Sequence, residues 1–411
     1  MATQGIRGEE LLSGGERFAP RPNLFSRLFA PGFKTMLDRV DQGFERGSIT
    51  AKLPDGTTRV LGGRAPGFDV HVDLKDWRAL LRLATSGSVG WYQAYEAGEW
   101  EADNHAHLFA LMSDNARTLG DTARSSGLSK LIARVAHYFN RNDRAGSVRN
   151  ISAHYDLGND FYRSWLDDTL TYSSALGYGA DGLQAAQFRK LDAIVERLGG
   201  AKSVLEIGCG WGALAERIAG SGADVTAISL SDEQLAYARE NRPASIAFDK
   251  RDYRDVSGQF DAIASVEMVE ALGREYWPAF LDCVAGNLKT GGRAAIQYIS
   301  MADDLFESYA NSADFIQAYV FPGGMLIKSA EFRALAEARG LEWRDQTDFG
   351  LDYAATLKEW RIAFDRAVAE RRLPEGFDER FIRLWRYYLS YCEGGFLAGN
   401  IDVHQVTLVK A

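Results

Sequence analysis

The sequence lacks long apolar runs, has few cysteines and carries no excess of basic charge, and each absence excludes a class of protein. No apolar run in its 411 residues approaches the roughly 18 to 20 residues of a membrane-spanning helix. The first residues have no apolar signal region, so we expect a cytoplasmic protein. Its three scattered cysteines indicate neither a disulfide framework nor a zinc cluster, and no metal site is predicted. A net charge of −9 argues against nucleic acid as a partner.

The composition is that of a soluble globular protein, with 46% hydrophobic and 25% charged residues. A chain of 411 residues is long for one domain and comfortable for two. A polar stretch at 140–147 contains a glycine, and we place a domain boundary just before it. The sequence therefore predicts a domain at 1–140 and another at 141–411.

A basic and aromatic stretch stands near the start of the chain. Five basic residues and one acid lie between Arg17 and Arg39, interleaved with leucines and phenylalanines. Such a stretch can lie in the headgroup region of an anionic membrane, which would make the protein peripherally associated with the inner face of the membrane. The alternative is a helix that packs its apolar face on its own domain, and the sequence leaves both open.

The segment 204–212 reads as a buried strand that runs into three glycines at alternate positions. Glycine permits a tight turn and a close approach of ligand to backbone, and Gly208 and Gly210 are placed for both. The Gly-x-Gly-x-Gly spacing is not the Gly-x-Gly-x-x-Gly of dinucleotide folds, and no lysine follows as in a P-loop. With the carboxylate of Glu206 before the turn, this pattern suits a ligand with an ammonium group and ribose hydroxyls, which describes S-adenosylmethionine.

Strand and helix patterns alternate from about residue 184 to residue 299, which predicts a parallel sheet with helices on both faces. Ligands of such sheets bind beyond the carboxyl ends of the strands. Before this region, short strands at 47–61 and 68–72 accompany helical patterns. We therefore expect an α/β protein, with a smaller α+β N-terminal domain followed by a Rossmann-like methyltransferase domain.

Several ordered motifs together resemble the cyclopropane-fatty-acid synthase family, which includes the mycolic acid methyltransferases. The motifs lie at 154–162, 170–173, 206–212, 251–255, 319–324 and 387–389. The resemblance extends from about residue 150 to the end, and more loosely over 87–100. It implies transfer of a methyl group from S-adenosylmethionine to the cis double bond of an unsaturated acyl chain in a membrane phospholipid.

The resemblance also implies which residues contact S-adenosylmethionine. The positions that match the family's contacts stand in the turn of the first strand and after the strands beside it: Tyr172, Ser173, Gly208, Gly210, Ser229, Gln234, Asp252 and Tyr253. The second strand ends without an acidic residue, so we expect hydroxyl and amide groups such as that of Gln234 to contact the ribose. The alternative for Gln234 is a solvated helix residue.

An alkene is a weak nucleophile, so the site must hold it dry and aligned and must stabilise the cation that forms. Aromatic faces can stabilise a cation through their quadrupoles. Tyr319, in a Tyr-x-Phe-Pro-Gly motif, is the leading candidate, and Phe161, Tyr162 and Tyr353 are further ones. A structural role is the alternative for each of them.

In the family, a bicarbonate held by a cysteine, a glutamate, a histidine and a tyrosine is thought to remove the proton that closes the cyclopropane. Glu270 and Tyr319 match the glutamate and the tyrosine, but Ser174 stands for the cysteine and Gln297 for the histidine. The family's Gly-x-x-Glu-His pattern also reads Glu-Met-Val-Glu-Ala here, so that Glu267 replaces a glycine and Ala271 a histidine. Bicarbonate is therefore a doubtful cofactor of this chain.

We hypothesise that Glu267 supplies the base that bicarbonate supplies elsewhere. If the short stretch is helical, Glu267 and Glu270 share one face, and their repulsion raises one pKa. The alternative is a surface replacement without a role. A relocated base favours a methylene or methyl-branched product over a cyclopropane, as in methyltransferases of the methyl-branched or furan fatty acid type.

Two rival classes stay open at this point. One is a non-catalytic lipid-binding protein that has kept the fold, because half of the base-binding set is altered. The other is a methyltransferase for a small soluble substrate, which the aromatic and basic N-terminal segments oppose. A second copy of the chain, in a homodimer, is a further partner that the sequence leaves open.

Overall fold

The protein is described by a computed structural model that covers residues 7–14, 30–120, 157–312 and 314–411. The chain forms two compact units, and each takes discontinuous parts of the sequence. Unit 1 comprises 1–140, 304–322 and 376–400, and unit 2 comprises 141–303, 323–375 and 401–411. Residues 154–156, the start of the motif at 154–162, lie outside the described residues. The two continuous domains expected from the sequence stay a prediction.

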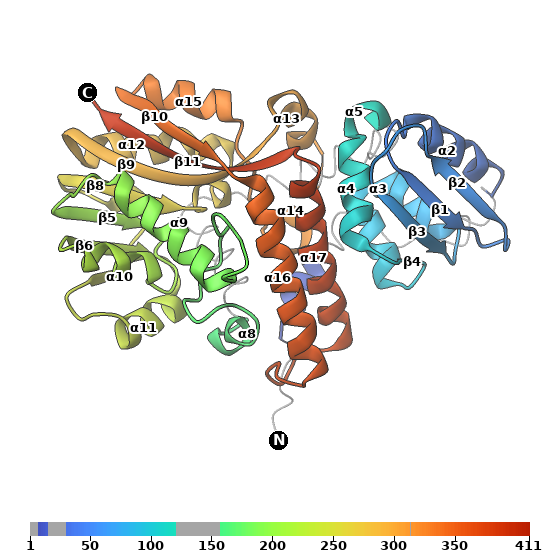
Figure 1. The fold of residues 1–411 in the computed structure, drawn as a ribbon, viewed down its shortest axis with the longest axis horizontal. Coiled ribbons are helices and arrows are strands. Elements are labelled where there is room, and N and C mark those ends of the chain that lie inside the picture. Colours follow the sequence, from blue (N-terminus) through green and yellow to red (C-terminus); the bar gives the residue numbers. More distant parts are fainter. Residues whose placement is uncertain (1–6, 15–29, 121–156, 313) are drawn as a thin grey trace. The chain divides into compact units, whose positions relative to one another are not determined.

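Unit 2 is built on a seven-stranded sheet in the order β10-β11-β9-β8-β5-β6-β7 (Figure 1). The five strands from β9 to β7 in this order are parallel, and β11 pairs antiparallel with both β9 and β10. The strands are β5 (Ser203–Ile207), β6 (Asp224–Ser229), β7 (Ala247–Lys250), β8 (Phe260–Val266), β9 (Leu288–Met301), β10 (Leu341–Asp348) and β11 (Ile401–Lys410). The parallel α/β sheet predicted from the sequence is confirmed.

Helices cover both faces of this sheet. The α-helices of unit 2 are α8 (Asn159–Arg163), α9 (Leu183–Arg197), α10 (Ala213–Gly220), α11 (Asp232–Asn241), α12 (Trp277–Asn287), α15 (Ser329–Glu337) and α16 (Gly350–Ala369). The 3-10 helices are η4 (Tyr253–Asp255), η5 (Val269–Ala271) and η6 (Arg274–Tyr276). Apolar side chains of α9, α10 and α11 form one core cluster with β5 and β6. On the other face, Phe332 of α15 contacts both Tyr298 of β9 and Trp277 of α12.

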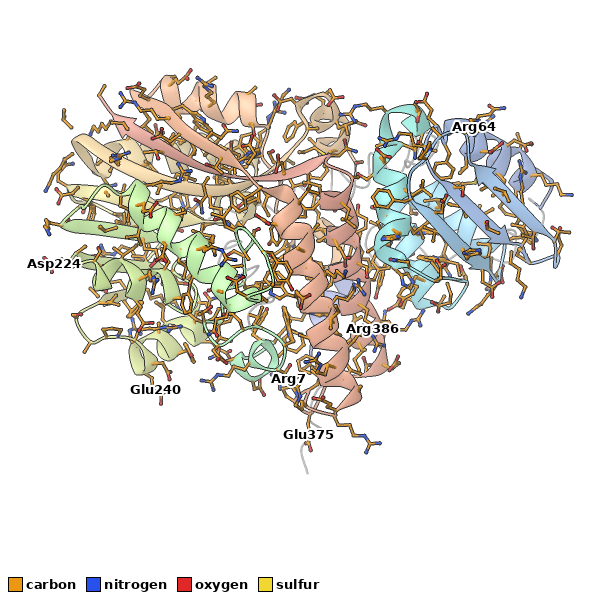
Figure 2. All side chains as sticks on the ribbon, viewed as in Figure 1. Arg7, Arg64, Asp224, Glu240, Glu375 and Arg386 are labelled. Carbon is orange, nitrogen blue, oxygen red and sulfur yellow. The ribbon has the colours of Figure 1, made fainter. Side chains whose placement is uncertain are left out.

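The amino and carboxyl ends of the parallel strands lie at opposite edges of the sheet. Asp224, the first residue of β6, and Glu240, near the end of α11, have exposed side chains at the outer surface of unit 2 (Figure 2). The register of the β5–β6 pair places Ile207 beside Ile228 at the carboxyl ends of these two strands. Ligands of parallel α/β sheets bind at the edge formed by the carboxyl ends of the strands.

Unit 1 contains a four-stranded sheet in the order β2-β1-β3-β4, with helices around it. The strands are β1 (Ser48–Lys52), β2 (Thr58–Gly62), β3 (Asp69–Leu74) and β4 (Trp100–Ala102). The helices are α1 (Glu9–Gly14), α2 (Ala30–Gly43), α3 (Arg78–Glu96), α4 (His105–Asp114), α5 (Ala116–Leu119), α13 (Asp303–Ala310), α14 (Phe315–Tyr319) and α17 (Glu379–Leu397). Among the described residues, none of the helices is both long and apolar enough to cross a membrane.

The described part of the basic N-terminal stretch packs on unit 1. Phe33, Leu37 and Val40 point from α2 into the core, and Phe33 stacks on Trp77 with ring centroids 5.6 Å apart. For α2 this is the packed arrangement that the sequence left open beside membrane contact. The basic residues at 17–27 lie outside the described residues.

The helices α4 and α17 of unit 1 approach each other closely at a glycine. A Cβ atom on Gly394 would lie 2.5 Å from the Cβ of Phe109 and 2.6 Å from the carbonyl oxygen of Ala106. Real Cβ atoms do not approach heavy atoms so closely, so only glycine fits at position 394 without a shift of the backbone. This contact joins a late segment of the chain to an early one within the same unit.

Candidate functional site

The glycine turn follows β5 at the carboxyl edge of the unit 2 sheet. Gly208 and Gly210 have φ of +84° and +52°, in the left-handed region that favours glycine. A Cβ on Gly208 would lie 2.8 Å from the Cγ of Met268, whereas a Cβ on Gly210 would meet nothing nearer than Gln234 Nε2 at 4.0 Å. Gly210 thus has open space beside its backbone, and its contact with a cofactor stays a prediction.

Glu206, the carboxylate before the turn, is almost fully buried in β5. The backbone N–H of Ala215 donates to it, and its Oε2 atom has no hydrogen-bond partner among the described residues. Burial raises the pKa of Glu206 to about 8, while attraction by Lys190 acts in the opposite direction. A buried acceptor without a partner is costly in the absence of a ligand or water.

Ser229 and Gln234 meet beyond the end of β6. The Oγ of Ser229 lies 3.2 Å from Oε1 of Gln234, and both side chains are buried. Ser231 caps α11, since its Oγ accepts from the N–H of Gln234 at 3.3 Å. Gln234 is therefore not a solvated helix residue, and its amide lies at the edge where a ribose contact was expected.

Asp252 and Tyr253 follow β7 on the same edge. The Oδ1 of Asp252 accepts from the backbone N–H of Arg254 at 2.9 Å, and its Oδ2 pairs with the Arg254 guanidinium at 2.6 Å. Tyr253 is buried, and burial raises its pKa to about 12. Its hydroxyl has no hydrogen-bond partner within the described ranges, which leaves a polar group for a ligand to meet.

Tyr172 and Ser173 lie in a loop held by α9. Gln187 Nε2 donates to the carbonyl oxygen of Ser173 at 2.9 Å, and Lys190 Nζ donates to the Ser173 hydroxyl at 2.6 Å. Tyr172 is partly exposed, and its ring contacts Tyr162 with centroids 5.5 Å apart. Side chains of α9 thus hold this loop in place by hydrogen bonds.

The carboxylate of Glu267 is the point where these elements converge. Its Oε1 accepts from the backbone N–H of Ser174 at 2.9 Å and from Nε2 of Gln297 at 2.7 Å. Its Oε2 accepts from the hydroxyl of Tyr353, on α16, at 2.8 Å. Three donors from three parts of the chain therefore hold one carboxylate, so Glu267 is not a free surface replacement.

The backbone of Glu267 adopts a conformation that glycine prefers. Its φ is +49°, and its N–H donates to the carbonyl oxygen of Gln297 at 2.8 Å. A residue with a side chain costs on the order of 1 kcal/mol at such a φ. The family's glycine at this position fits the same backbone without that cost, so the strain at Glu267 persists only because the surrounding contacts hold it.

Burial and hydrogen bonding act in opposite directions on Glu267. Burial raises its pKa, while the charge of Lys190 and the donors Ser174, Tyr353 and Gln297 lower it. Hydrogen bonds to a carboxylate favour its charged form. Burial is the larger effect, so the pKa of Glu267 is raised above that of an ordinary carboxylate.

Glu270 has a different environment three residues further on. Burial, and then repulsion by Glu267, raise its pKa to about 8. Its Oε1 accepts from the backbone N–H of Ile299, and its Oε2 has no hydrogen-bond partner in the part of the chain that the structure describes. At neutral pH Glu270 is thus the protonated member of the pair.

The expected helical stacking of Glu267 and Glu270 is wrong. The 3-10 helix η5 begins only at Val269, and Glu267 precedes it with a left-handed backbone. The strand β8 ends at Val266, and the turn after it sends Glu267 toward Ser174 and Gln297. Burial rather than repulsion is the larger cause of the raised pKa of Glu270.

Two buried residues orient the partners of Glu267. Gln405 of β11 donates from Nε2 to Oε1 of Gln297 at 3.0 Å, which leaves the Gln297 amide nitrogen facing Glu267. Thr356 of α16 accepts from the N–H of Ala175, next to Ser174, at 3.1 Å. The Ser174 hydroxyl itself donates to the carbonyl oxygen of Ala175 at 2.8 Å. Ser174 thus reaches Glu267 through its backbone.

Tyr319 belongs to unit 1, whereas Glu267 and Glu270 belong to unit 2. It ends α14 and is buried against Tyr92, with ring centroids 4.5 Å apart, and Gln93 Nε2 donates to its hydroxyl at 3.3 Å. Asp314 caps α14 and accepts from the hydroxyl of Tyr391 at 2.6 Å. A role for Tyr319 in stabilising a cation stays a prediction.

The sequence did not predict that Lys190, Tyr353 and Gln405 act on Glu267 or on its partners. Tyr353 was expected to face a cation, but it donates to Glu267. Phe161 and Tyr162 are fully buried and pack edge to face, with ring centroids 5.3 Å apart. A lysine on the apolar face of α9 was the one available signal for Lys190.

The fold and the turn define an S-adenosylmethionine-dependent methyltransferase. A profile of the family described as mycolic acid cyclopropane synthetase matches residues 142–406. The tuberculostearic acid methyltransferase UfaA1 of Mycobacterium tuberculosis is 34% identical over 385 residues, which cover 87% of this chain and 86% of that protein. The cyclopropane-fatty-acyl-phospholipid synthase of Escherichia coli is 33% identical, over 85% of this chain and 90% of its own.

Solved structures agree with this assignment. The cyclopropane synthase MmaA2 from Mycobacterium tuberculosis superposes with a TM-score of 0.60 at 27% identity, over 66% of this chain and all of its own. The mycolic acid cyclopropane synthase CmaA1, solved with SAH and CTAB, superposes with a TM-score of 0.60 at 28% identity, over 64% of this chain and 98% of its own. The chain belongs to the mycolic acid cyclopropane synthetase family and is an S-adenosylmethionine-dependent fatty acid methyltransferase.

The residues at the carboxyl edge fit the cofactor. The backbone of Gly210 has open space beside it, and the buried Oε2 of Glu206 has no hydrogen-bond partner among the described residues. A ligand with polar groups would fill the first and satisfy the second. Ser229, Gln234 and Asp252 supply hydroxyl, amide and carboxylate groups on the neighbouring strands. S-adenosylmethionine is the cofactor of the family, and these groups fit it; their contacts with it stay a prediction.

Proposed function

We propose that the chain methylates the cis double bond of unsaturated acyl chains in membrane phospholipids, and that Glu267 is the base that completes the reaction. The observation that carries this proposal is the set of three donors around the Glu267 carboxylate. Two of them, Ser174 and Gln297, stand where the family has bicarbonate ligands. The side chain of Glu267 thus offers a carboxylate that the protein itself holds.

S-adenosylmethionine supplies the electrophilic methyl group, and Glu206, Gly210, Ser229, Gln234 and Asp252 are the residues that would hold it. The new carbon–carbon bond leaves a cation on the acyl chain. A hydride shift moves the cation to the methylated carbon, and loss of a methyl proton to Glu267 then gives a methylene group. A saturated methyl branch needs a further two-electron reduction by a separate reductant.

The state of the two carboxylates suits this step. Glu267 accepts three hydrogen bonds and is attracted by Lys190, and both effects favour its charged form, whereas burial raises its pKa. Glu270, with its pKa at about 8, is mostly protonated at neutral pH. A base with a raised pKa takes up a proton near neutral pH more effectively than an ordinary carboxylate.

A cyclopropane product is the second candidate, and one observation favours it. Glu270 keeps the family's glutamate position, and its Oε2 has no hydrogen-bond partner among the described residues, so it could still hold a bicarbonate. Proton loss to that ion would close the ring. Because Glu270 is unaltered, a cyclopropane is the alternative product that the expression experiment must distinguish.

The test is expression in a host that has abundant monounsaturated phospholipid and no such enzyme. We expect acyl chains that have gained one carbon and two hydrogens, with the vinylidene proton signals of a methylene group by NMR. Upfield proton signals of a cyclopropane ring in the NMR spectrum would favour the cyclopropane product instead. Unchanged acyl chains, together with no transfer of labelled methyl to lipid by the purified protein, would contradict methyl transfer altogether.

A further inference from the structure

Lys190 is a fully buried lysine on the inner face of α9. Lysine is almost never buried in full unless its charge is paired. Its Nζ donates to the hydroxyl of Ser173 at 2.6 Å, which satisfies one of three ammonium hydrogens with a neutral group. The charge itself must be balanced by other residues.

Three carboxylates from three elements attract this ammonium. They are Glu267 after β8, Asp167 in the segment after α8, and Glu206 in β5. Burial lowers the pKa of Lys190 to about 8, and all three carboxylates oppose that shift. One positive charge cannot balance three negative ones in a buried region, so some of the carboxylates must be neutral.

The surroundings decide which carboxylate keeps its charge. Burial raises the pKa of Glu206 to about 8 and raises that of Asp167 as well. Glu206 has one acceptor oxygen without a partner among the described residues, and Asp167 also has one. Glu267 has donors on both oxygens, and Tyr353 and Gln297 supply two of them. The charge of Lys190 is therefore matched chiefly by Glu267.

The same face of α9 also holds the loop that carries Ser173 and Ser174. Gln187, one turn before Lys190, donates to the carbonyl oxygens of Ser173 and Thr171 at 2.9 and 3.4 Å. Ser173 is a predicted cofactor contact, and the N–H of Ser174 donates to Glu267. One helix face thus holds the loop whose next residue, Ser174, donates to Glu267.

We infer that Lys190 is a positioning residue that fixes Ser173, and with it the adjacent Ser174 N–H on the carboxylate of Glu267, and so couples the base to the cofactor loop. This inference rests on the proposed role of Glu267. The groups that set the charge of Glu267 are then Lys190 on α9, Glu270 on η5 and Tyr353 on α16. Loss of the Lys190 charge makes Glu267 protonate at higher pH, because the attraction that favours its charged form is gone.

The test compares the pH dependence of methyl transfer in wild-type protein and in Lys190→Met, with kcat and KM measured from pH 6 to pH 9.5. We expect the acid limb of the kcat profile to move to higher pH in Lys190→Met. Activity at pH 7 should fall about tenfold and recover largely at pH 9, since protonation of the base is reversed there. Lys202→Met, at an exposed lysine before β5, is the matched control and should leave the profile unchanged.

A second variant separates the charge from the hydrogen bond. Ser173→Ala keeps the ammonium but removes its acceptor, so we expect weaker binding of S-adenosylhomocysteine by calorimetry and a smaller displacement of the acid limb than in Lys190→Met, because Gln187 still holds the carbonyl oxygen of residue 173. A Lys190→Met profile that superposes on the wild-type profile would overturn the inference. If Lys190→Met does not fold, Lys190→Gln, which keeps a polar head without charge, must show the same displaced limb, and an unmoved limb overturns the inference equally.

The two proposals fail in different ways in this experiment. Wild-type protein that transfers no methyl to lipid at any pH contradicts the proposed function. An active wild-type enzyme with no difference in pH profile between it and Lys190→Met contradicts only the inference about Lys190.

Discussion

The Oε1 atom of Glu267 lies 2.7 Å from Nε2 of Gln297. Both residues stand at positions where this chain departs from the pattern of its family. A third of the four departures, Ser174, donates its N–H to the same oxygen at 2.9 Å. Three substitutions that are far apart in the sequence thus meet at one carboxylate. Their meeting is expected if a side chain has taken over a task that a bound ion performs in relatives.

Replacement of Glu267 tests the base directly. Glu267→Gln keeps the shape of the side chain but cannot accept a proton, so we expect kcat to fall roughly 10²- to 10⁴-fold, the usual contribution of a general base. Binding of S-adenosylhomocysteine should stay within about threefold of wild type, because no cofactor contact is assigned to this carboxylate. Label transfer and calorimetry measure the two effects. A Glu267→Gln enzyme with wild-type kcat would exclude Glu267 as the base.

Glu267→Gly restores the residue that the family pattern has at this position and relieves the strain at φ +49°. We expect it to be as inactive as Glu267→Gln in carbonate-free buffer, and to regain activity when bicarbonate or formate is added, because the donors on Ser174, Gln297 and Tyr353 are then vacant. Glu267→Gln, which still fills the space, is the control and should not be rescued. Equal rescue of both variants would contradict a specific carboxylate site.

Tyr353→Phe removes one donor from Glu267 and no other contact of that carboxylate. The lost hydrogen bond favoured the charged form, so the pKa of Glu267 rises further and the acid limb of the kcat profile moves to higher pH. Activity at pH 7 should fall several-fold and recover in alkaline buffer. A pH-independent loss would mean that Tyr353 acts on the substrate and not through Glu267.

Glu270 makes the stability of the fold depend on pH. Its pKa of about 8 lies above the ordinary glutamate pKa of 4.5, so the folded state holds a proton that the unfolded state loses between these two pH values. The free energy of unfolding therefore falls as the pH rises through this window and is constant above it. Glu270→Gln cannot ionise, so its melting temperature should exceed that of wild type at pH 9, by roughly 2 to 4 °C per kcal/mol. The two proteins should melt together near pH 4, and a gap of the same size at both values would exclude ionisation as the cause.

Two glycine substitutions separate ligand approach from backbone strain. Gly210→Ala and Gly200→Ala both place a side chain at positive φ, +52° and +73°, with open space around the new Cβ. Both should lose on the order of 1 kcal/mol of stability. Only Gly210→Ala should weaken binding of S-adenosylhomocysteine, by tenfold or more, because only that turn lies at the cofactor edge. Equal affinities in calorimetry would move the cofactor away from Gly210.

The sequence predicted those parts of the site that depend on local order along the chain. The strand before Gly208, the turn and helix α10 follow one another directly, so the parallel α/β sheet could be recognised there. Two strands of the unit 2 sheet were missed for physical reasons. The strand β7 (Ala247–Lys250) has only four residues and one buried side chain, and β10 (Leu341–Asp348) is an edge strand with mostly exposed residues. Neither carries an apolar alternation.

The partners of Glu267 could be predicted only in part, because sheet pairing brings them together. Gln405 meets Gln297 because β11 pairs with β9 in a register that places these two residues opposite each other. Lys190 reaches Ser173 through the position of α9 on the sheet. The discontinuity of the two units has the same origin, since 304–322 and 376–400 join unit 1 through contacts that local patterns do not encode.

The most direct test of the central claim is the rate of methyl transfer to phospholipid by the wild-type enzyme in carbonate-depleted buffer, with and without added bicarbonate. Because the chain holds its own carboxylate at Glu267, we predict rates that agree within about twofold and a methylene product under both conditions. A strong requirement for added bicarbonate would contradict the account.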